Sequence, residues 1–272
     1  MVEMVKSDLT VGSIPEHFYR LAIPMAIGMV FYTLYNMVGI YFAGKLSTSA
    51  QAGIGIGHLV YFFLIAFGFG LNAAMAGLVG NSLGEKKISE AKVLIAKGIS
   101  LAIVISISLI VFGILCGPSI INLVSETGSY REYSVRYFLV LLSALPAFLI
   151  SYTCNGALQA QGDSVSMQRA LVAAFFLIII ITPILIFGVP NLWLGIGFDG
   201  IALSVVICQF LVMVFLLIQV KRSALGLHFT SKVSLTNFRV YYKIIKQMIP
   251  GCMSFQMVII GSLVVQFALK GF

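Results

Sequence analysis

The chain has 272 residues, of which 60% are hydrophobic and 10% are charged. Soluble domains are about 45–50% apolar and about 25% charged, so this composition excludes a soluble globular fold and predicts a polytopic membrane protein. The net charge of +8 is typical of lysines and arginines that flank membrane spans on the cytoplasmic side, and we expect no nucleic-acid partner.

Seven long apolar runs follow one another along the chain. Helices are expected because hydrocarbon offers no hydrogen-bond partner to an open backbone, and because the runs lack the alternation of barrel strands. Each run is near the ~20 residues that a bilayer core requires. The predicted fold class is therefore all-α, with spans at residues 21–43, 55–79, 98–116, 134–158, 168–188, 199–220 and 247–269.

The basic residues predict the orientation of these spans. With the N-terminus inside, 13 of the 17 lysines and arginines fall on cytoplasmic segments. The four on the outer side are Lys45, Arg131, Arg136 and Lys270. We therefore expect a multi-pass protein of the cell membrane with a cytoplasmic N-terminus, and with the loops at 80–97 and 221–246 inside.

Titratable and metal-binding residues are scarce in the apolar runs. None of the nine carboxylates lies in the middle of an expected span, which argues against a proton relay built on acids, because intramembrane carboxylates are usually functional. His58 lies near an expected span edge, where a histidine usually meets headgroups or water. The four cysteines have no CxxC spacing, and no nucleophile elbow or phosphate loop occurs, so we expect neither a cofactor nor an enzyme.

A short repeat predicts the domain organisation. HFYRLAIP ends at Pro24 and KIIKQMIP ends at Pro250, an offset of 226 residues, and each precedes an apolar run. Two helices that begin on the same side indicate a parallel repeat. We expect a fragment of a longer protein, or a short subunit, with a six-helix lobe at 1–220, a basic cytoplasmic loop with an interfacial helix at 221–246, and the first helix of a truncated second lobe at 247–272.

Four stretches and the seventh run then carry a family resemblance that covers almost the whole chain. They read IPMAIGMVFYTLYNMVGIYFAGKL, GFGLNAAMAGLVGNSLGEKKISEAK, NGALQAQGDSVSMQRALV, PILIFG with GIALSVVICQ, and IPGCMSFQMVII. In this order they resemble the multidrug and toxic compound extrusion (MATE) transporters. The resemblance implies two six-helix lobes around a central cavity. It also implies export of cationic or amphipathic organic compounds by alternating access, coupled to a proton or sodium gradient.

The resemblance also exposes three departures. Positions where the family often has acids read Gly39 and Thr182, and an expected asparagine reads Ile178. A hydroxyl or amide carries no proton at neutral pH, so we expect ion coupling to rest on the second lobe or to be lost.

Candidate cavity residues follow from the polar positions within the spans. Gly28, Tyr32, Asn36 and Gly39 share one face of a helix at spacings of four, four and three. Tyr32 offers an aromatic face to a cation, and Asn36 requires a buried partner. This face lines a cavity or packs against another helix, and ligand contact and interhelical hydrogen bonding are likewise both open for Asn155, Thr182, Gln209 and Gln256.

The sequence leaves two rival functions open. A lipid-linked oligosaccharide flippase has a similar shape, but it requires basic residues inside its cavity, and no lysine or arginine lies mid-span here. A non-transporting or degenerate membrane scaffold fits the missing acids.

Overall fold

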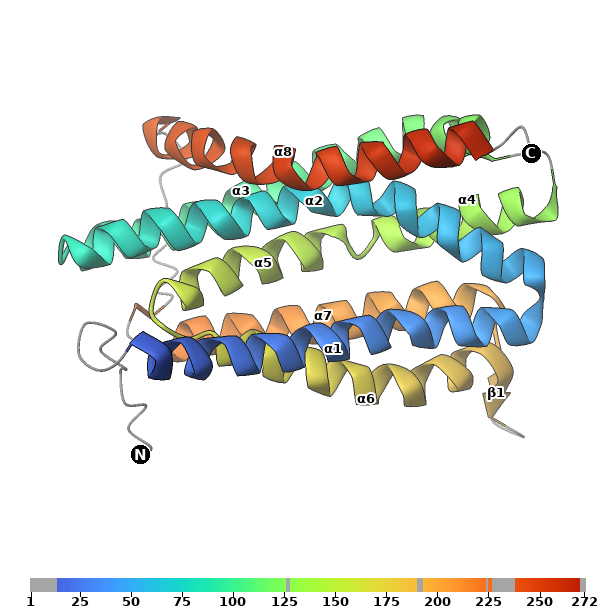
Figure 1. The fold of residues 1–272 in the computed structure, drawn as a ribbon, viewed down its shortest axis with the longest axis horizontal. Coiled ribbons are helices and arrows are strands. Elements are labelled where there is room, and N and C mark those ends of the chain that lie inside the picture. Colours follow the sequence, from blue (N-terminus) through green and yellow to red (C-terminus); the bar gives the residue numbers. More distant parts are fainter. Residues whose placement is uncertain (1–13, 126–127, 190–192, 224, 227–237, 270–272) are drawn as a thin grey trace.

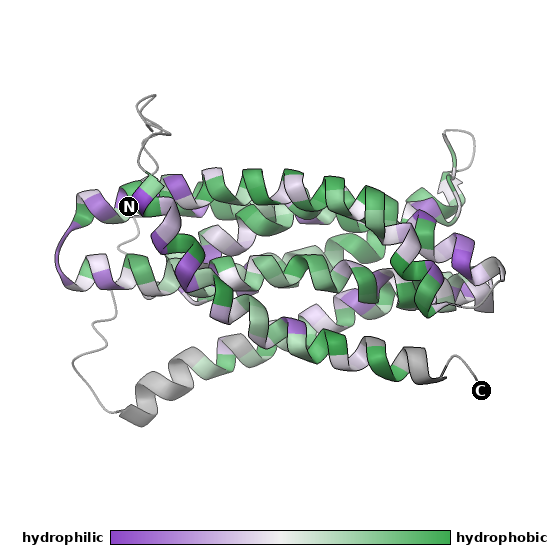
Figure 2. Ribbon diagram, turned by 90° about the horizontal axis from the view of Figure 1, so that it is seen from above, coloured by the Kyte–Doolittle hydropathy of each residue, from purple (hydrophilic) through white to green (hydrophobic). Residues whose placement is uncertain are grey.

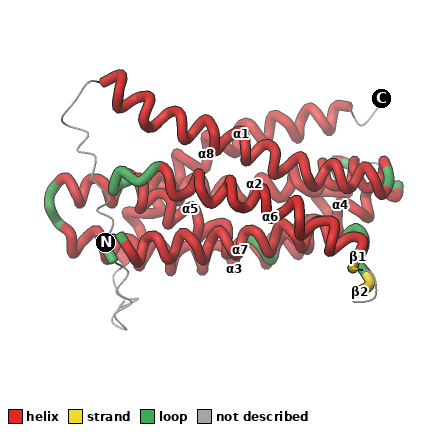
Figure 3. Tube along the Cα trace, turned by 90° about the horizontal axis from the view of Figure 1, so that it is seen from below, coloured by secondary structure: helices red, strands yellow, loops and turns green. Residues whose placement is uncertain are grey.

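The computed structural model describes residues 14–125, 128–189, 193–223, 225–226 and 238–269 (Figure 1). These segments are almost entirely helical (Figure 3), apart from one two-residue hairpin that pairs β1 (Gly188–Val189) with β2 (Trp193–Leu194). The helices are α1 (Ile14–Leu46), α2 (Thr48–Gly84), α3 (Ile88–Val124), α4 (Ser129–Leu142), α5 (Leu145–Gln159), α6 (Val165–Phe187), α7 (Asp199–Arg222) and α8 (Phe238–Leu269).

Seven membrane spans are consistent with these helices. Six of them are long and apolar enough to cross a bilayer, and α4 with α5 forms a bent pair that supplies the seventh. The predicted all-α polytopic fold is therefore confirmed. At 37 residues each, α2 and α3 extend about 55 Å, so they project well beyond a hydrocarbon core of about 30 Å. Hydrophilic residues gather toward the helix ends in Figure 2.

The fourth expected span, 134–158, is broken rather than continuous. The segments Tyr130–Leu142 and Leu145–Gln159 meet at an angle of 54°. Pro146 lies at the start of α5, where it has no N–H for the carbonyl four residues earlier and its ring clashes with that carbonyl. The backbone N–H groups of Ser143 and Ala144 donate instead to carbonyls three residues back, which tightens the last turn of α4.

The two helices of the predicted repeat, α1 and α8, lie on opposite sides of the bundle (Figure 1), and the repeat itself stays a prediction. In Figure 1, α1 lies with α6 and α7 on one side of the bundle and α8 lies along α2 and α3 on the other. Both α1 and α8 begin at the same end of the bundle. The turns between α2 and α3 and between α5 and α6 lie at that end as well. The segments predicted to be cytoplasmic thus share one end, while their side of the membrane stays a prediction.

The interfacial helix expected within residues 221–246 is not a separate element. Phe238–Leu269 is one helix, so the expected boundary at 246/247 falls inside α8. The first turns pack on the bundle: Ile244 is fully buried, and the Lys97 ammonium lies 5.0 Å from the centre of the Tyr241 ring. Burial of apolar side chains against α2 and α3 stabilises these first turns as part of α8. Residues 227–237 lie outside the described chain, and the division into two lobes stays a prediction.

Two glycines bring α2 and α8 into close contact. A Cβ on Gly70 would lie 2.2 Å from Cys252 Sγ and 2.7 Å from the Met248 carbonyl oxygen, and a Cβ on Gly251 would lie 3.1 Å from Gly70 Cα. Such contacts are typical of membrane helices that associate through small residues. Close contact between the backbones of α2 and α8 therefore determines where α8 packs on the bundle.

Local capping also agrees with the sequence. Asp163 Oδ1 accepts hydrogen bonds from the backbone N–H groups of Val165 (3.1 Å) and Ser166 (2.9 Å), as expected for a residue that caps α6. At the preceding turn Gly162 has a φ of 81°, a conformation that glycine adopts without strain. The tight connection predicted for the sequence QGD is confirmed.

Candidate functional site

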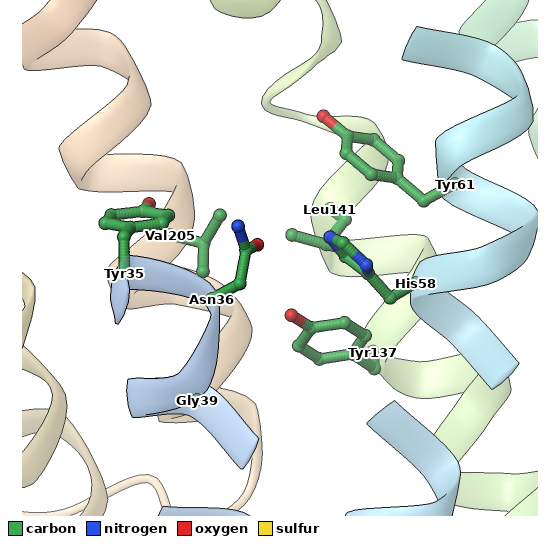
Figure 4. Close-up of a pocket in the computed structure, with 8 residues that line it drawn as sticks. All are labelled: Tyr35, Asn36, Gly39, His58, Tyr61, Tyr137, Leu141 and Val205. Carbon is green, nitrogen blue, oxygen red and sulfur yellow. The ribbon is translucent and has the colours of Figure 1, made fainter. Parts of the chain in front are cut away.

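A small cavity lies between α1, α2, α4 and α7, with a volume of about 30 Å³, room for one or two water molecules. Figure 4 shows the α1 and α7 residues on one wall and the α2 and α4 residues across from them. Its lining residues are Tyr35, Asn36, Gly39, His58, Tyr61, Tyr137, Leu141 and Val205.

The cavity lies well inside α1 and α2, and we call it the mid-span cavity. Asn36 is ten residues before the end of α1 at residue 46, and His58 is ten residues after the start of α2 at residue 48. Both are therefore about 15 Å from the turn between the helices. The expected span began at residue 55, whereas α2 begins at Thr48, where the Ser47 hydroxyl caps it by accepting a hydrogen bond from the Ala50 N–H (3.0 Å).

The lining is polar but uncharged. It contains three tyrosines, one amide and one imidazole, and no lysine, arginine, aspartate or glutamate is among the eight lining residues. The Asn36 side-chain nitrogen donates to the Tyr32 carbonyl oxygen at 2.7 Å. The Tyr35 hydroxyl is buried and has no hydrogen-bond partner within the described residues. A buried hydroxyl without a partner is costly, so this atom is available to a water molecule or a ligand.

Two of the seven predicted site residues meet in this cavity, Asn36 and Gly39. A Cβ on Gly39 would lie 3.4 Å from Ile201 Cγ2 of α7, and one on Gly28 would overlap the Gln168 side chain of α6. The face predicted from Gly28 to Gly39 therefore both packs against helices and lines a cavity. Tyr32 contributes its backbone carbonyl to Asn36 and is absent from the lining.

The other predicted residues lie elsewhere in the bundle. The Thr182 hydroxyl donates to Ser204 Oγ at 2.9 Å, and both residues are fully buried between α6 and α7. The Gln209 amide donates to Ser151 Oγ of α5 at 3.4 Å. These contacts favour interhelical hydrogen bonding at Thr182 and Gln209.

Asn155 and Gln256 lie apart from the cavity as well. Asn155 is buried in α5, and its Oδ1 accepts no hydrogen bond from the described residues. Gln256 is half-buried on α8, beside Phe255, whose ring stacks on Phe69 at 4.1 Å between centroids. The seven residues therefore do not form one site.

The sequence prediction did not include Tyr35, His58, Tyr61 and Tyr137 among the cavity residues. One signal was available, because His58 and Tyr61 are three residues apart and so share a helix face. Tyr137 comes from a helix far along the chain, and only the packing of α4 against α2 brings it to this cavity.

A second, larger hollow of about 770 Å³ opens at the end of the bundle where α2 ends and α8 begins. We call it the α2–α8 cleft. Its lining includes Glu85, Lys87, Glu90, Lys243 and Lys246. The Lys87 ammonium lies 2.5 Å from the Glu85 carboxylate, and this contact lowers the pKa of the Glu85 carboxyl below its ordinary value. The Lys243 ammonium is 3.9 Å from the Glu90 carboxylate.

Metal binding has no support in the described part of the chain. No group of three or more histidine, cysteine, aspartate or glutamate side chains comes together there in a way that could hold an ion.

Comparison with known proteins gives a consistent result. A family model described as MatE matches residues 24–184. The multidrug resistance protein NorM of Vibrio parahaemolyticus is 29% identical over 195 residues, which cover 69% of this chain and 41% of that protein. The multidrug export protein MepA of Staphylococcus haemolyticus is 22% identical over 259 residues, which cover 95% of this chain and 56% of that protein.

Further likenesses extend this set. An FAD transporter of Shewanella oneidensis is 21% identical over 170 residues, 62% of this chain and 38% of that protein. A solved transporter of the MOP superfamily from Pyrococcus furiosus gives a TM-score of 0.79 at 23% identity, over 90% of this chain and 53% of that one. This last likeness concerns the fold. The chain spans about half the length of the curated relatives it matches.

Proposed function

The chain belongs to the MatE family of transporters, and from this premise we propose that it forms part of a secondary active exporter of cationic or amphipathic organic compounds. The observation that carries the proposal is the lining of the mid-span cavity. Aromatic rings and an amide attract an organic cation, and the tyrosines and Asn36 provide both within an uncharged wall.

The proposed cycle is one of alternating access, and the small size of the cavity requires it to widen during that cycle. At about 30 Å³ it is far below the several hundred Å³ of a typical ligand pocket. A substrate therefore requires a rearrangement of α1, α2, α4 and α7 that widens this space, in addition to the rocking of the two lobes in the proposed cycle. The energy source under this proposal is a proton or sodium gradient across the membrane.

An anionic cargo is disfavoured by the same lining. A flippase for a phosphate-linked lipid, or a carrier of an anionic cofactor such as the FAD transporter named above, requires fixed positive charge beside its cargo. No lysine or arginine is among the eight residues that line the cavity. The basic residues Lys243 and Lys246 line the α2–α8 cleft instead, together with two carboxylates.

Accumulation of dyes in cells that lack their own exporters tests the proposed function. We expect the complete protein to lower the accumulation of a cationic dye and to leave a neutral or anionic dye of similar size unchanged. Export of the anionic dye alone would favour the flippase-like alternative. A well-inserted protein that exports neither would favour a non-transporting scaffold.

The proposed location is the cell membrane, with the N-terminus in the cytoplasm. Single cysteines placed at Gly84 and Arg222, on a background without native cysteines, should resist an impermeant thiol reagent in intact cells and react after permeabilisation. Both positions lie at the end of the bundle where α1 begins. Labelling from outside would reverse the orientation.

A further inference from the structure

We propose that His58 is the proton-binding group of the mid-span cavity, and that its imidazole takes the place of the carboxylate that this lobe lacks. The inference rests on the proposed exporter function, which it deepens by naming the coupling ion and the residue that binds it.

The position of His58 is the first support. It lines the cavity together with Asn36 and Gly39 of α1, inside the transmembrane helices and about 15 Å from the turn between α1 and α2. Ionisable side chains at this depth are costly and usually functional. His58 contacts aromatic rings on its own helix, with ring centroids 6.5 Å from Tyr61 and 5.8 Å from Phe62.

The chemistry of the neighbours is the second support. The titratable groups that face His58 are tyrosines: Tyr35 from α1, Tyr61 from α2 and Tyr137 from α4, while α7 contributes Val205. Phenols ionise near pH 10 and an amide does not ionise, whereas an imidazole changes charge near neutral pH. Among the described lining residues, His58 is therefore the side chain whose protonation makes the cavity positive.

The cavity can also accommodate the charged form. An imidazolium donates two N–H hydrogen bonds. The tyrosine hydroxyl oxygens and the Asn36 amide oxygen are potential acceptors around it, and the Tyr35 hydroxyl has no hydrogen-bond partner within the described residues. One or two water molecules fit in the remaining volume and connect these groups to the ring.

The proposed step exchanges one proton for one positive charge. With the cavity open to the outside, an imidazole nitrogen lone pair takes a proton from water, and the new imidazolium repels a cationic substrate. With the cavity open to the inside, the N–H bond breaks, the proton returns to water, and the neutral cavity binds the next cation. Such a device works because the proton and the cationic substrate favour different states of the protein. The proposal thus places a coupling site in the first lobe, where the sequence predicted none.

Proton release is the direct test. Calorimetric binding of a cationic dye to the complete protein, repeated in buffers of different ionisation enthalpy, counts the protons released per dye bound. We expect up to one proton for the wild type and none for His58→Gln, with a dissociation constant that changes at most about threefold, since one hydrogen bond is altered. His228→Gln, the same substitution at another histidine, should release as many protons as the wild type.

Transport provides a second test with a rescue. In liposomes with an imposed pH gradient, His58→Gln should lower gradient-driven transport at least about tenfold. Gly39→Asp combined with His58→Gln should restore part of it, because the Cβ at Gly39 would be in ordinary contact with Ile201 and a cavity carboxylate can carry the proton. A His58→Gln protein that keeps gradient dependence or releases protons would overturn the proposal.

NMR of the histidine ring in the wild type separates this inference from the proposed function and requires no variant that must fold and transport. The His58 signal should change between about pH 4 and pH 8, with its assignment confirmed by its absence in His58→Gln. A constant signal would overturn the proton site. A titrating signal in a protein that exports no cation would support the proton site and contradict the exporter.

Discussion

The mid-span cavity and the α2–α8 cleft show opposite solutions to the placement of polar groups. The cavity gathers tyrosines, an amide and a histidine with no fixed charge among its described lining residues. The cleft gathers two glutamates and three lysines, with ion pairs at 2.5 Å and 3.9 Å. The Lys87 and Glu85 side chains are 57% and 60% exposed, so water solvates their charges.

The difference teaches that depth determines which chemistry is available. Charge is inexpensive at the end of the bundle and costly in its middle. A group that changes charge is useful in the middle because each change there has a large electrostatic effect. The residues of the cleft solubilise and orient the helices, whereas the residues of the cavity are suited to respond to an ion or substrate.

A permanent charge in the cavity is the most severe way to test this contrast. Leu141 is fully buried and lines the cavity, so Leu141→Lys should lower stability by about 2.5–3.5 kcal/mol, the insertion cost of an unpaired lysine at mid-span. Asn81→Lys, at an exposed position in the cleft, should change stability by about 0.5 kcal/mol or less.

A thiol-reactive dye provides the measurement for these variants, because Cys154, Cys208 and Cys252 are buried and react as the protein unfolds on heating. Equal unfolding temperatures for Leu141→Lys and Asn81→Lys would mean that the cavity tolerates charge as the cleft does.

The second largest effect is expected where α2 and α8 cross. Gly251 lines the cleft and contacts Gly70. Gly70→Ala should destabilise the protein by about 1–3 kcal/mol, because the new Cβ would meet Cys252 Sγ and the Met248 carbonyl. Gly55→Ala has nothing within 4 Å and should stabilise α2 by about 0.5–1 kcal/mol. The same unfolding assay measures both, and a stabilising Gly70→Ala would contradict the close crossing.

Thr182→Val tests a polar residue that lies outside both hollows. The hydrogen bond from Thr182 to Ser204 is lost, while the Ser204 hydroxyl still donates to the Ile201 carbonyl oxygen at 2.7 Å. We expect a loss of about 0.6 kcal/mol, at most a several-fold weaker binding of substrate, and unchanged dependence on the gradient. Thr182→Ser keeps the hydroxyl and serves as the control. Loss of gradient dependence in Thr182→Val alone would move the coupling site to α6.

Glu85→Gln should have the smallest effect. The lowered pKa of the Glu85 carboxyl means that its pairing with Lys87 stabilises the fold above the ordinary carboxyl pKa and that this contribution disappears as the pH falls through the lowered value. Because the pair is solvated, the wild type and the variant should unfold at nearly the same temperature at pH 7 and at the same temperature at pH 3. A large difference at pH 7 would show that the cleft shields its charges.

The sequence by itself determined the all-α membrane class, the approximate spans and the turn before α6. Apolar length requires membrane helices because an unpaired backbone is too costly in hydrocarbon, and seven spans follow. Asp163 and Gly162 act locally, so the turn before α6 was predictable. Pro146 offered a signal for the break between α4 and α5, but the continuous apolar run around it predicted a single span.

Only the tertiary structure decided which polar residues meet. A helix face can be derived from spacing, as it was for Asn36 and Gly39, but the partner across the face depends on which helices pack together. The cavity combines residues of α1, α2, α4 and α7, and Thr182 pairs with Ser204. The depth of His58 depended on where α2 begins, since the small and polar residues before it do not distinguish a helix from a loop. Packing therefore places an imidazole beside the position where the sequence lacks a carboxylate.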